Sequence, residues 1–213
     1  MFSKIIKFLR CLPDLKLLCS FKYSGILWDY GWWRSYKKKL PVDKEGNPLP
    51  WVTYPFIEFI TPRLRKEYTM FEYGGGSSTF FFSKYVNEIF TVESDKEWYK
   101  KLKSKCQLNV TPIYKKLIRD GEYAKMAVDT GKKFDIISVD GRDRANCIKN
   151  ALSALKDEGV IILDDSEREE YKESVDFLRS HSFRSIDFWG FSPGLFYRKC
   201  TSILYKDKNC LGI

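Results

Sequence analysis

The chain of 213 residues has one histidine, His181, and its six cysteines include no C-x-x-C pair. Structural zinc sites are built from such pairs or from clusters of cysteine and histidine, so the sequence predicts no zinc site. Two of the scattered cysteines, Cys147 and Cys200, lie in apolar runs, as small core residues do. We therefore expect reduced thiols and a cytoplasmic protein. His181 follows a predicted helix, and we expect a position at the surface or at the helix end for it.

Long apolar runs are also missing, because no stretch approaches the roughly 20 residues that a membrane-spanning helix needs. Residues 1–18 are partly apolar, but Lys7, Arg10 and Lys16 interrupt them, and no small-residue cleavage site follows. A signal peptide is therefore not predicted. The segment is typical of a basic amphipathic helix, which would dock on the protein itself or lie peripherally on the inner face of a membrane.

Acidic residues are fewer than basic ones, 28 against 37, and the net charge is +9. A basic surplus is typical of proteins that bind nucleic acid or anionic membranes. Much of the surplus lies in three short runs, and such runs are usually solvated faces. Nucleic acid is therefore a less favoured partner than a small molecule. The runs are residues 37–39, 100–105 and 115–116.

Aromatic residues are abundant, at 16%, and the hydrophobic share of 44% is enough for a substantial core. They are densest in residues 1–67, which we predict to be an extension preceding a domain at 68–213. Most should pack in the interior. A second interpretation places Trp32, Trp33 and Trp51 at the rim of a substrate site, because aromatic faces stack on sugar rings.

Strand and helix patterns alternate from residue 68 onwards. The last two predicted strands are joined by a loop too short for a crossover helix, so they should pair antiparallel. The alternation predicts an α/β fold: a doubly wound, Rossmann-like, mostly parallel seven-stranded sheet with an antiparallel C-terminal hairpin. Strands are predicted at 68–72, 88–93, 110–114, 134–141, 159–163, 183–188 and 201–205. Helices are predicted at 54–60, 77–85, 95–106, 143–156 and 167–180, and a further short helix follows the loop around residues 119–121 and ends at about residue 128.

Three consecutive glycines, residues 74–76, follow the first predicted strand, and Ser77 or Ser78 should cap the helix that comes next. Glycine permits backbone conformations with positive φ and lets a ligand approach closely. The N-terminus of a helix offers unpaired N–H donors. A nucleoside-containing ligand therefore suits this turn, although a complete G-x-G-x-x-G for NAD is missing.

Carboxylates follow several predicted strands, and Glu72, Glu93, Asp140 and Asp164 should meet at one edge of the sheet. Ligands of doubly wound sheets bind at this edge. With the glycine turn, these acids make residues 68–207 resemble the class I S-adenosylmethionine-dependent methyltransferases. The resemblance implies S-adenosylmethionine as cofactor, bound by Glu72, Gly74, Gly75, Gly76, Ser77, Ser78, Glu93, Ser94, Asp120, Gly121, Asp140 and Gly141.

The resemblance also implies roles. Glu93 would hold the ribose hydroxyls, Asp120 would lie near the adenine amine, and Asp140 near the methionine end. The motifs VDGRDR (139–144) and LDDSERE (163–169) resemble a bacterial branch, loosely FkbM-like, that is associated with surface-glycan biosynthesis. The implied acceptor is a sugar or another small molecule with a hydroxyl group.

Methyl transfer to a hydroxyl requires alignment of the acceptor and removal of a proton. The catalytic candidates are Asp140, Asp164 and Asp165, of which the last two are preferred as general base. Acids at these strand ends also resemble the Mg²⁺ ligands of catechol O-methyltransferase-like enzymes, so a divalent metal remains an alternative. We do not favour it, because Asp165 stands where that family has an asparagine.

Arg142 and Arg144 have two interpretations. They could bind an acidic acceptor, or they could form salt bridges to Asp143, Glu167 or Glu169. Three functions thus remain: O-methylation of a sugar, methylation of RNA or DNA, and a non-catalytic module that binds a nucleotide or a partner.

Overall fold

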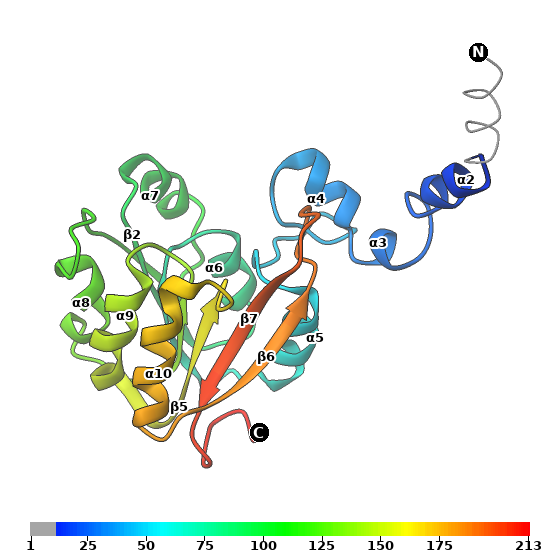
Figure 1. The fold of residues 1–213 in the computed structure, drawn as a ribbon. Helices are drawn as coiled ribbons and strands as arrows, with labels where there is room; N and C mark the ends of the chain where they lie inside the picture. Colours follow the sequence, from blue (N-terminus) through cyan, green and yellow to red (C-terminus); the bar gives the residue numbers. More distant parts are fainter. Residues whose placement is uncertain (1–11) are drawn as a thin grey trace.

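The computed structural model describes residues 12–213, which form a seven-stranded sheet with helices on both faces (Figure 1). The strand order is β3-β2-β1-β4-β5-β7-β6. β1 to β5 are parallel, whereas β7 is antiparallel to β5 and β6. The predicted fold is therefore confirmed. The strands are β1 (Thr69–Tyr73), β2 (Glu88–Glu93), β3 (Val110–Tyr114), β4 (Phe134–Val139), β5 (Leu155–Asp164), β6 (Arg184–Gly190) and β7 (Lys199–Tyr205).

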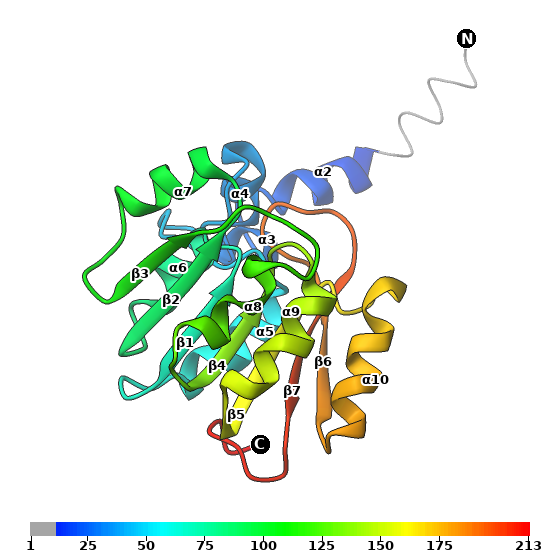
Figure 2. The same ribbon diagram turned by 90° about the vertical axis from the view of Figure 1, so that its left-hand side faces the viewer.

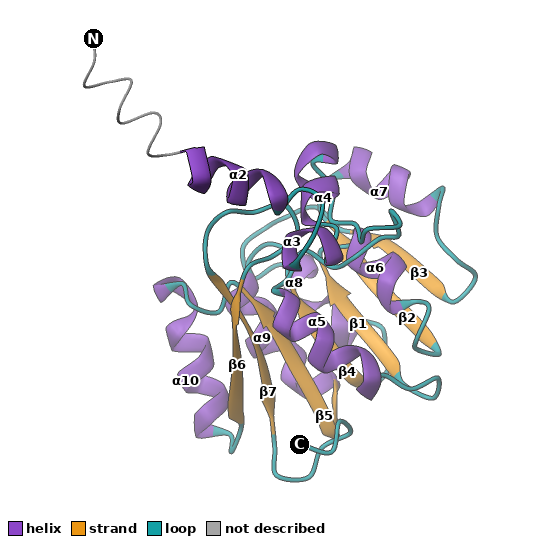
Figure 3. Ribbon diagram, turned by 90° about the vertical axis from the view of Figure 1, so that its right-hand side faces the viewer, coloured by secondary structure: helices purple, strands orange, loops and turns teal. Residues whose placement is uncertain are grey.

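Two apolar cores lie on the two faces of this sheet. Helices α8 to α10 cover one face (Figure 2), and α5 and α6 cover the other (Figure 3). Each fully buried Ile or Phe in these cores contributes roughly 1.5–3 kcal/mol. The helices are α2 (Leu12–Ser20), α3 (Ile26–Asp29), α4 (Trp32–Lys38), α5 (Tyr54–Ile60), α6 (Ser77–Phe82), α7 (Lys96–Lys103), α8 (Glu122–Asp129), α9 (Arg144–Ala151) and α10 (Lys172–Ser180).

The end of the extension belongs to the core of the sheet. Helix α5 begins with Pro55 in its first turn, where a missing N–H costs nothing, and ends before Pro62 as predicted. Its Phe56 and Ile60 are fully buried against the β1 residue Met70.

Residues 1–11 of the predicted N-terminal helix lie outside the described residues. None of the helices within residues 12–213 combines the length and the apolar character of a membrane span.

Several predicted boundaries are wrong by a few residues. The helix predicted at 143–156 ends at Ala151, because Leu155 pairs with Phe134 and begins β5. The helix predicted from residue 167 begins as α10 only at Lys172, after a short 3₁₀ turn. The helix α6 is capped at Gly76 rather than at Ser77 or Ser78.

The expectations for the single histidine and for two cysteines are confirmed. His181 is exposed at the end of α10, where its ring packs against Phe177. Cys147 and Cys200 are both buried. None of these side chains lines the cleft described next.

Candidate functional site

A cleft of about 820 Å³ opens where the parallel strands end. Its walls come from the segments that follow β1, β2 and β4, and β1 lies between the other two strands. This is the switch point at which doubly wound sheets bind ligands. The cleft is lined by Trp51, Gly74, Gly75, Glu93, Ser94, Asp95, Trp98, Leu117, Tyr123, Asp140, Gly141, Arg142, Arg144 and Arg168.

Six of the predicted cofactor-binding residues thus line this cleft. Gly76, Ser77 and Ser78 line an adjoining hollow of about 170 Å³, together with Leu40 and Pro41 from the extension. Each of the three glycines therefore lines the cleft, the adjoining hollow or both.

The turn after β1 and the loop after β4 touch backbone to backbone. Gly74 has a φ of +91°, and a Cβ on it would lie 2.5 Å from the Cα of Gly141. A side chain at either position would separate the two loops. Gly76, by contrast, has room for a Cβ, which would make an ordinary van der Waals contact with a Trp98 ring atom at 3.8 Å.

Glu72 is buried beneath the turn, with 1% exposure, and does not line the cleft. Its Oε2 accepts hydrogen bonds from Thr91 Oγ1, at 2.9 Å, and from Thr79 Oγ1. Thr79 Oγ1 in turn accepts from the N–H of Gly76 at 2.9 Å. Among the described residues, Glu72 Oε1 has no partner. Burial raises the pKa of Glu72 to about 7.

Glu93 is the last residue of β2, and one of its two carboxylate oxygens accepts hydrogen bonds. Its Oε1 accepts from the N–H groups of Ser94, at 2.6 Å, and Asp95, at 2.8 Å. In residues 12–213, Oε2 has no hydrogen-bond partner. Asp95 caps α7 by accepting from Trp98 N, and Trp98 Nε1 donates to Gly75 O at 2.6 Å. The start of α7 therefore positions both the acid and the turn.

Asp120 and Gly121 lie outside the lining of the cleft. The N–H of Asp120 donates to Asp143 Oδ2 at 2.7 Å, and its Oδ1 accepts from Asn150 Nδ2 at 2.8 Å. The side chain thus contacts α9. Leu117, from the same loop, lines the cleft instead.

Asp140 lines the cleft and is 23% exposed. Its Oδ1 lies 3.0 Å from Arg144 Nη2. Burial and the nearby charge of Asp164 raise the pKa of Asp140 well above its usual range, against the influence of Arg144. Arg144 is itself buried and also donates to the carbonyl oxygens of Gly141 and Asp164, so it joins the loops after β4 and β5.

Asp164 and Asp165 lie behind this wall and share Lys199, the first residue of β7. The Nζ of Lys199 contacts Asp164 Oδ2 and lies 2.6 Å from Asp165 Oδ1. Asp164 Oδ1 also accepts from Thr201 Oγ1 at 2.7 Å. Neither carboxylate lines the cleft.

Three cations surround Asp165. Besides Lys199, Arg168 Nη2 lies 2.6 Å and Arg144 Nη1 3.4 Å from Asp165 Oδ2. Burial alone would raise the pKa of Asp165, but the hydrogen bond and charge of Lys199 lower it. Arg144 therefore pairs with Asp140 and Asp165, and not with Asp143, Glu167 or Glu169, the partners that the sequence suggested. Arg142 has no ion pair within the described chain and lines the cleft.

No group of three or more His, Cys, Asp or Glu side chains within residues 12–213 could hold a metal ion. Lys199 Nζ lies between Asp164 and Asp165, and Arg144 bridges Asp140 and Asp165. Side-chain cations thus take the positions next to the carboxylates that a divalent ion would need.

The three tryptophans that could line the rim of a substrate site lie in three different places. Trp51 lines the cleft, and its Nε1 donates to Pro193 O at 2.8 Å. Trp32 is buried in the core. Trp33 lines a separate hollow in the extension.

Sequence reasoning missed Lys199, Trp98 and Thr79. Lys199 is 35 residues from Asp164 in the sequence, and only the antiparallel pairing of β7 with β5 brings them together. Thr79 had a detectable signal, because a hydroxyl three residues after a cap can bond back to it. Trp98 had no local signal, because its indole donates to Gly75, which is 23 residues away in the sequence.

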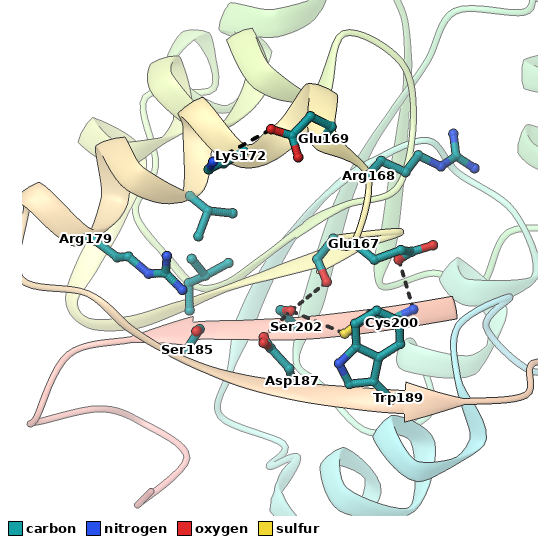
Figure 4. A pocket seen from close by; sticks show the side chains of 13 residues that line it. Glu167, Arg168, Glu169, Lys172, Arg179, Ser185, Asp187, Trp189, Cys200 and Ser202 are labelled. Carbon is teal, nitrogen blue, oxygen red and sulfur yellow. Dashed lines mark hydrogen bonds and ion pairs between the residues drawn. The ribbon is translucent and has the colours of Figure 1, made fainter. Parts of the chain in front are cut away.

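A second pocket, of about 190 Å³, shares Arg168 with the cleft and lies between α10 and strands β6 and β7. Figure 4 shows Ser202 and Asp187 on its floor, with Trp189 beside them. Ser202 Oγ donates to Asp187 Oδ1 at 2.6 Å. Hydroxyls, three carboxylates, three cationic side chains and an indole thus line one small pocket.

No protein-family model matches the chain, and no curated protein matches it. Solved structures do. A precorrin-6y C5,15-methyltransferase from Geobacter metallireducens has a TM-score of 0.55 at 20% identity, over 80% of this chain and 92% of that one. A precorrin 8w decarboxylase from Methanobacterium thermoautotrophicum has 0.52 at 15%, over 79% and 97%. An rRNA methylase from Streptococcus thermophilus has 0.52 at 14%, over 70% and 92%. The chain therefore has the fold of these proteins.

Proposed function

We propose that the protein is an S-adenosylmethionine-dependent methyltransferase that methylates a hydroxyl oxygen of a sugar or another small acceptor. The observation that carries the proposal is the cleft at the strand switch point, lined by the glycine turn, Glu93 and Asp140. When bound, the cofactor supplies a methyl group on a sulfonium centre.

The residues of the cleft suit this cofactor. Glu93 keeps one carboxylate oxygen unpaired within the described chain, and a carboxylate accepts hydrogen bonds from a ribose diol strongly. Trp98 and Leu117 offer apolar surface for the adenine. Glu72 supports the turn from below and fixes its conformation.

Asp140 is our candidate for the group that takes the acceptor's proton. Of the three predicted catalytic acids it is the one that lines the cleft, and its raised pKa brings proton exchange closer to neutral pH. Asp165 then holds Arg144, which contacts Asp140 and the Gly141 carbonyl and so positions the Asp140 loop. Lys199 pairs with Asp164 and Asp165.

Two features support a carbohydrate acceptor, as in surface-glycan biosynthesis. The second pocket beside the cleft combines Trp189 with the polar groups of Asp187 and Ser202, a combination that suits a sugar ring. The Arg142 guanidinium, free of ion pairs within the described residues, could contact an anionic substituent on the acceptor.

Calorimetry with S-adenosylhomocysteine tests the proposal. Wild type should bind, and Glu93→Gln should weaken binding by about tenfold to a hundredfold, because a charge-assisted hydrogen bond is lost. Glu97→Gln, which changes an exposed acid on α7 paired with Lys100, is the matched control and should bind like wild type. Absence of binding by wild type would refute the cofactor.

Methylation of RNA is the second candidate, favoured by the net charge of +9 and by the likeness to an rRNA methylase. It requires polynucleotide binding that weakens steeply with salt. Failure to retain a labelled structured RNA at 50 mM NaCl would remove this candidate, while leaving the cofactor assignment in place.

A further inference from the structure

Residues 15–40, here called the arm, contain most of α2 and all of α3 and α4 and extend beyond the sheet and its helices (Figure 1). The arm carries large apolar side chains in contact with solvent. Leu17, Leu18, Ile26 and Trp28 are 58%, 60%, 59% and 48% exposed, and Tyr23 is 68% exposed. So many exposed apolar groups on one short segment are typical of an interaction surface.

The arm is also strongly basic. It contains six basic residues and one acidic residue, Asp29, which gives a net charge of +5. The basic residues are exposed to solvent. They are Lys16, Lys22, Arg34, Lys37, Lys38 and Lys39.

A hollow of about 320 Å³ combines both properties. Cationic side chains line it, among them Lys22, Arg34 and Lys37, and no acid is part of its lining. Trp28 and Tyr23 contribute aromatic walls. A single anionic group with an apolar attachment, such as the phosphate of a lipid headgroup, fits this chemistry.

The surface is held in place by the body of the protein. Tyr30 stacks on Tyr54 of α5 with ring centroids 4.3 Å apart. Trp32 is buried and donates from Nε1 to Leu195 O at 3.0 Å. Leu40 ends the arm and lines the hollow beside the glycine turn, so the arm leads directly to the candidate cofactor site.

We propose that the arm docks the protein on the surface of a membrane that contains anionic phospholipids. Tryptophan and tyrosine favour the interface between lipid and water. Basic residues are attracted to anionic headgroups, and apolar side chains enter the boundary of the acyl region. The docking stands on the arm alone and does not depend on the proposed methyltransferase activity.

Sedimentation with vesicles tests the docking. The full chain should bind vesicles of phosphatidylcholine with 30 mol% phosphatidylglycerol, and bind pure phosphatidylcholine far more weakly. Replacing Lys37, Lys38 and Lys39 together by Gln should lower the partition constant by about a hundredfold, because each basic residue near an anionic surface contributes about fivefold. Trp28→Ser should lower it further, since the indole no longer enters the interface.

The matched control replaces Lys100, Lys101 and Lys103 of α7 by Gln, which removes the same charge from another surface. It should bind the anionic vesicles like wild type. An equal loss in this control, or no binding to anionic vesicles at 50 mM NaCl, overturns the proposal. Sedimentation velocity without lipid gives a further check: a dimer that Leu17→Ser converts to a monomer would assign the arm to a second copy of the chain and also overturn it.

Discussion

Asp140 differs from Asp164 and Asp165 in its surroundings, although all three lie at the ends of the adjacent strands β4 and β5. Asp140 has one cationic partner, Arg144, and is partly exposed in the cleft. Asp165 has three cationic partners, and Lys199 and Thr201 hold Asp164. Asp165, held by three cations, loses its charge only at a cost and is therefore a poor proton acceptor. Burial raises the pKa of Asp164, but Asp164 does not line the cleft.

Replacing Asp140 by Asn should therefore lower kcat by 10²–10⁴-fold, the usual contribution of a general base. The measurement is transfer of labelled methyl from S-adenosylmethionine to an acceptor found in a glycan screen. In wild type, kcat should rise with pH through the raised pKa of Asp140, because the base acts when deprotonated. Asp143→Asn, at the start of α9 outside the cleft lining, serves as control. An Asp140→Asn enzyme as fast as wild type would contradict the assignment.

Glu72 should make stability depend on pH. Its pKa is about 7 in the folded chain and 4.5 in its ordinary state, so between these values the folded chain keeps a proton that the unfolded chain has lost. Stability therefore falls as pH rises through this window, by about 3 kcal/mol from this group. Urea unfolding between pH 4.5 and 8 should show a shallower pH dependence for Glu72→Gln.

The control for that experiment is Glu122→Gln, an exposed acid paired with Lys115. Its pH dependence between pH 4.5 and 8 should match that of wild type. A Glu72→Gln curve parallel to wild type would show that Glu72 ionises near its ordinary pKa in the folded protein.

At the scale of elements, the site depends on how closely the loop after β1 approaches the loop after β4. Gly74→Ala combines a positive φ with a Cβ placed 2.5 Å from Gly141. Gly131→Ala has a positive φ of +69° with nothing within 4 Å, so it measures the backbone strain alone. Gly74→Ala should be less stable than Gly131→Ala by about 1–3 kcal/mol, the cost of overpacking.

Urea unfolding measures the difference, and calorimetry with S-adenosylhomocysteine should show a loss of binding for Gly74→Ala only. Equal stability of the two variants would mean that the loops separate freely, and that their contact does not shape the cleft.

At the scale of the whole molecule, cofactor binding should stabilise the fold, because the cleft joins segments from three strands. S-Adenosylhomocysteine at a hundred times its Kd should add about 2.7 kcal/mol. For a chain of this size, that raises Tm by roughly 5–10 °C. Thermal unfolding measures it, with NAD at the same concentration as the control.

Adding EDTA should leave this shift unchanged, since Lys199 and Arg144 neutralise the acids that a metal would use. A shift that EDTA abolishes would restore the metal alternative. An unchanged Tm with S-adenosylhomocysteine would contradict the proposed cofactor.

Local sequence determined the order and type of the elements. The continuous apolar runs of β4 and β5 predicted strands buried on both faces, and Pro62 and the glycines marked where elements end. Because parallel strands share one carboxyl edge, the strand-end positions of Glu93 and Asp140 were enough to place both at the cleft. Short-range periodicity carries this information.

Only the tertiary structure decided what each acid contacts. The antiparallel return of β7 inserts Lys199 between Asp164 and Asp165, the packing of α9 draws Asp120 away from the cleft, and Thr79 and Thr91 hold Glu72 beneath the turn. These contacts join residues 7 to 35 positions apart. Strand and helix periods specify which face a side chain occupies, but the partner on that face depends on how the elements pack.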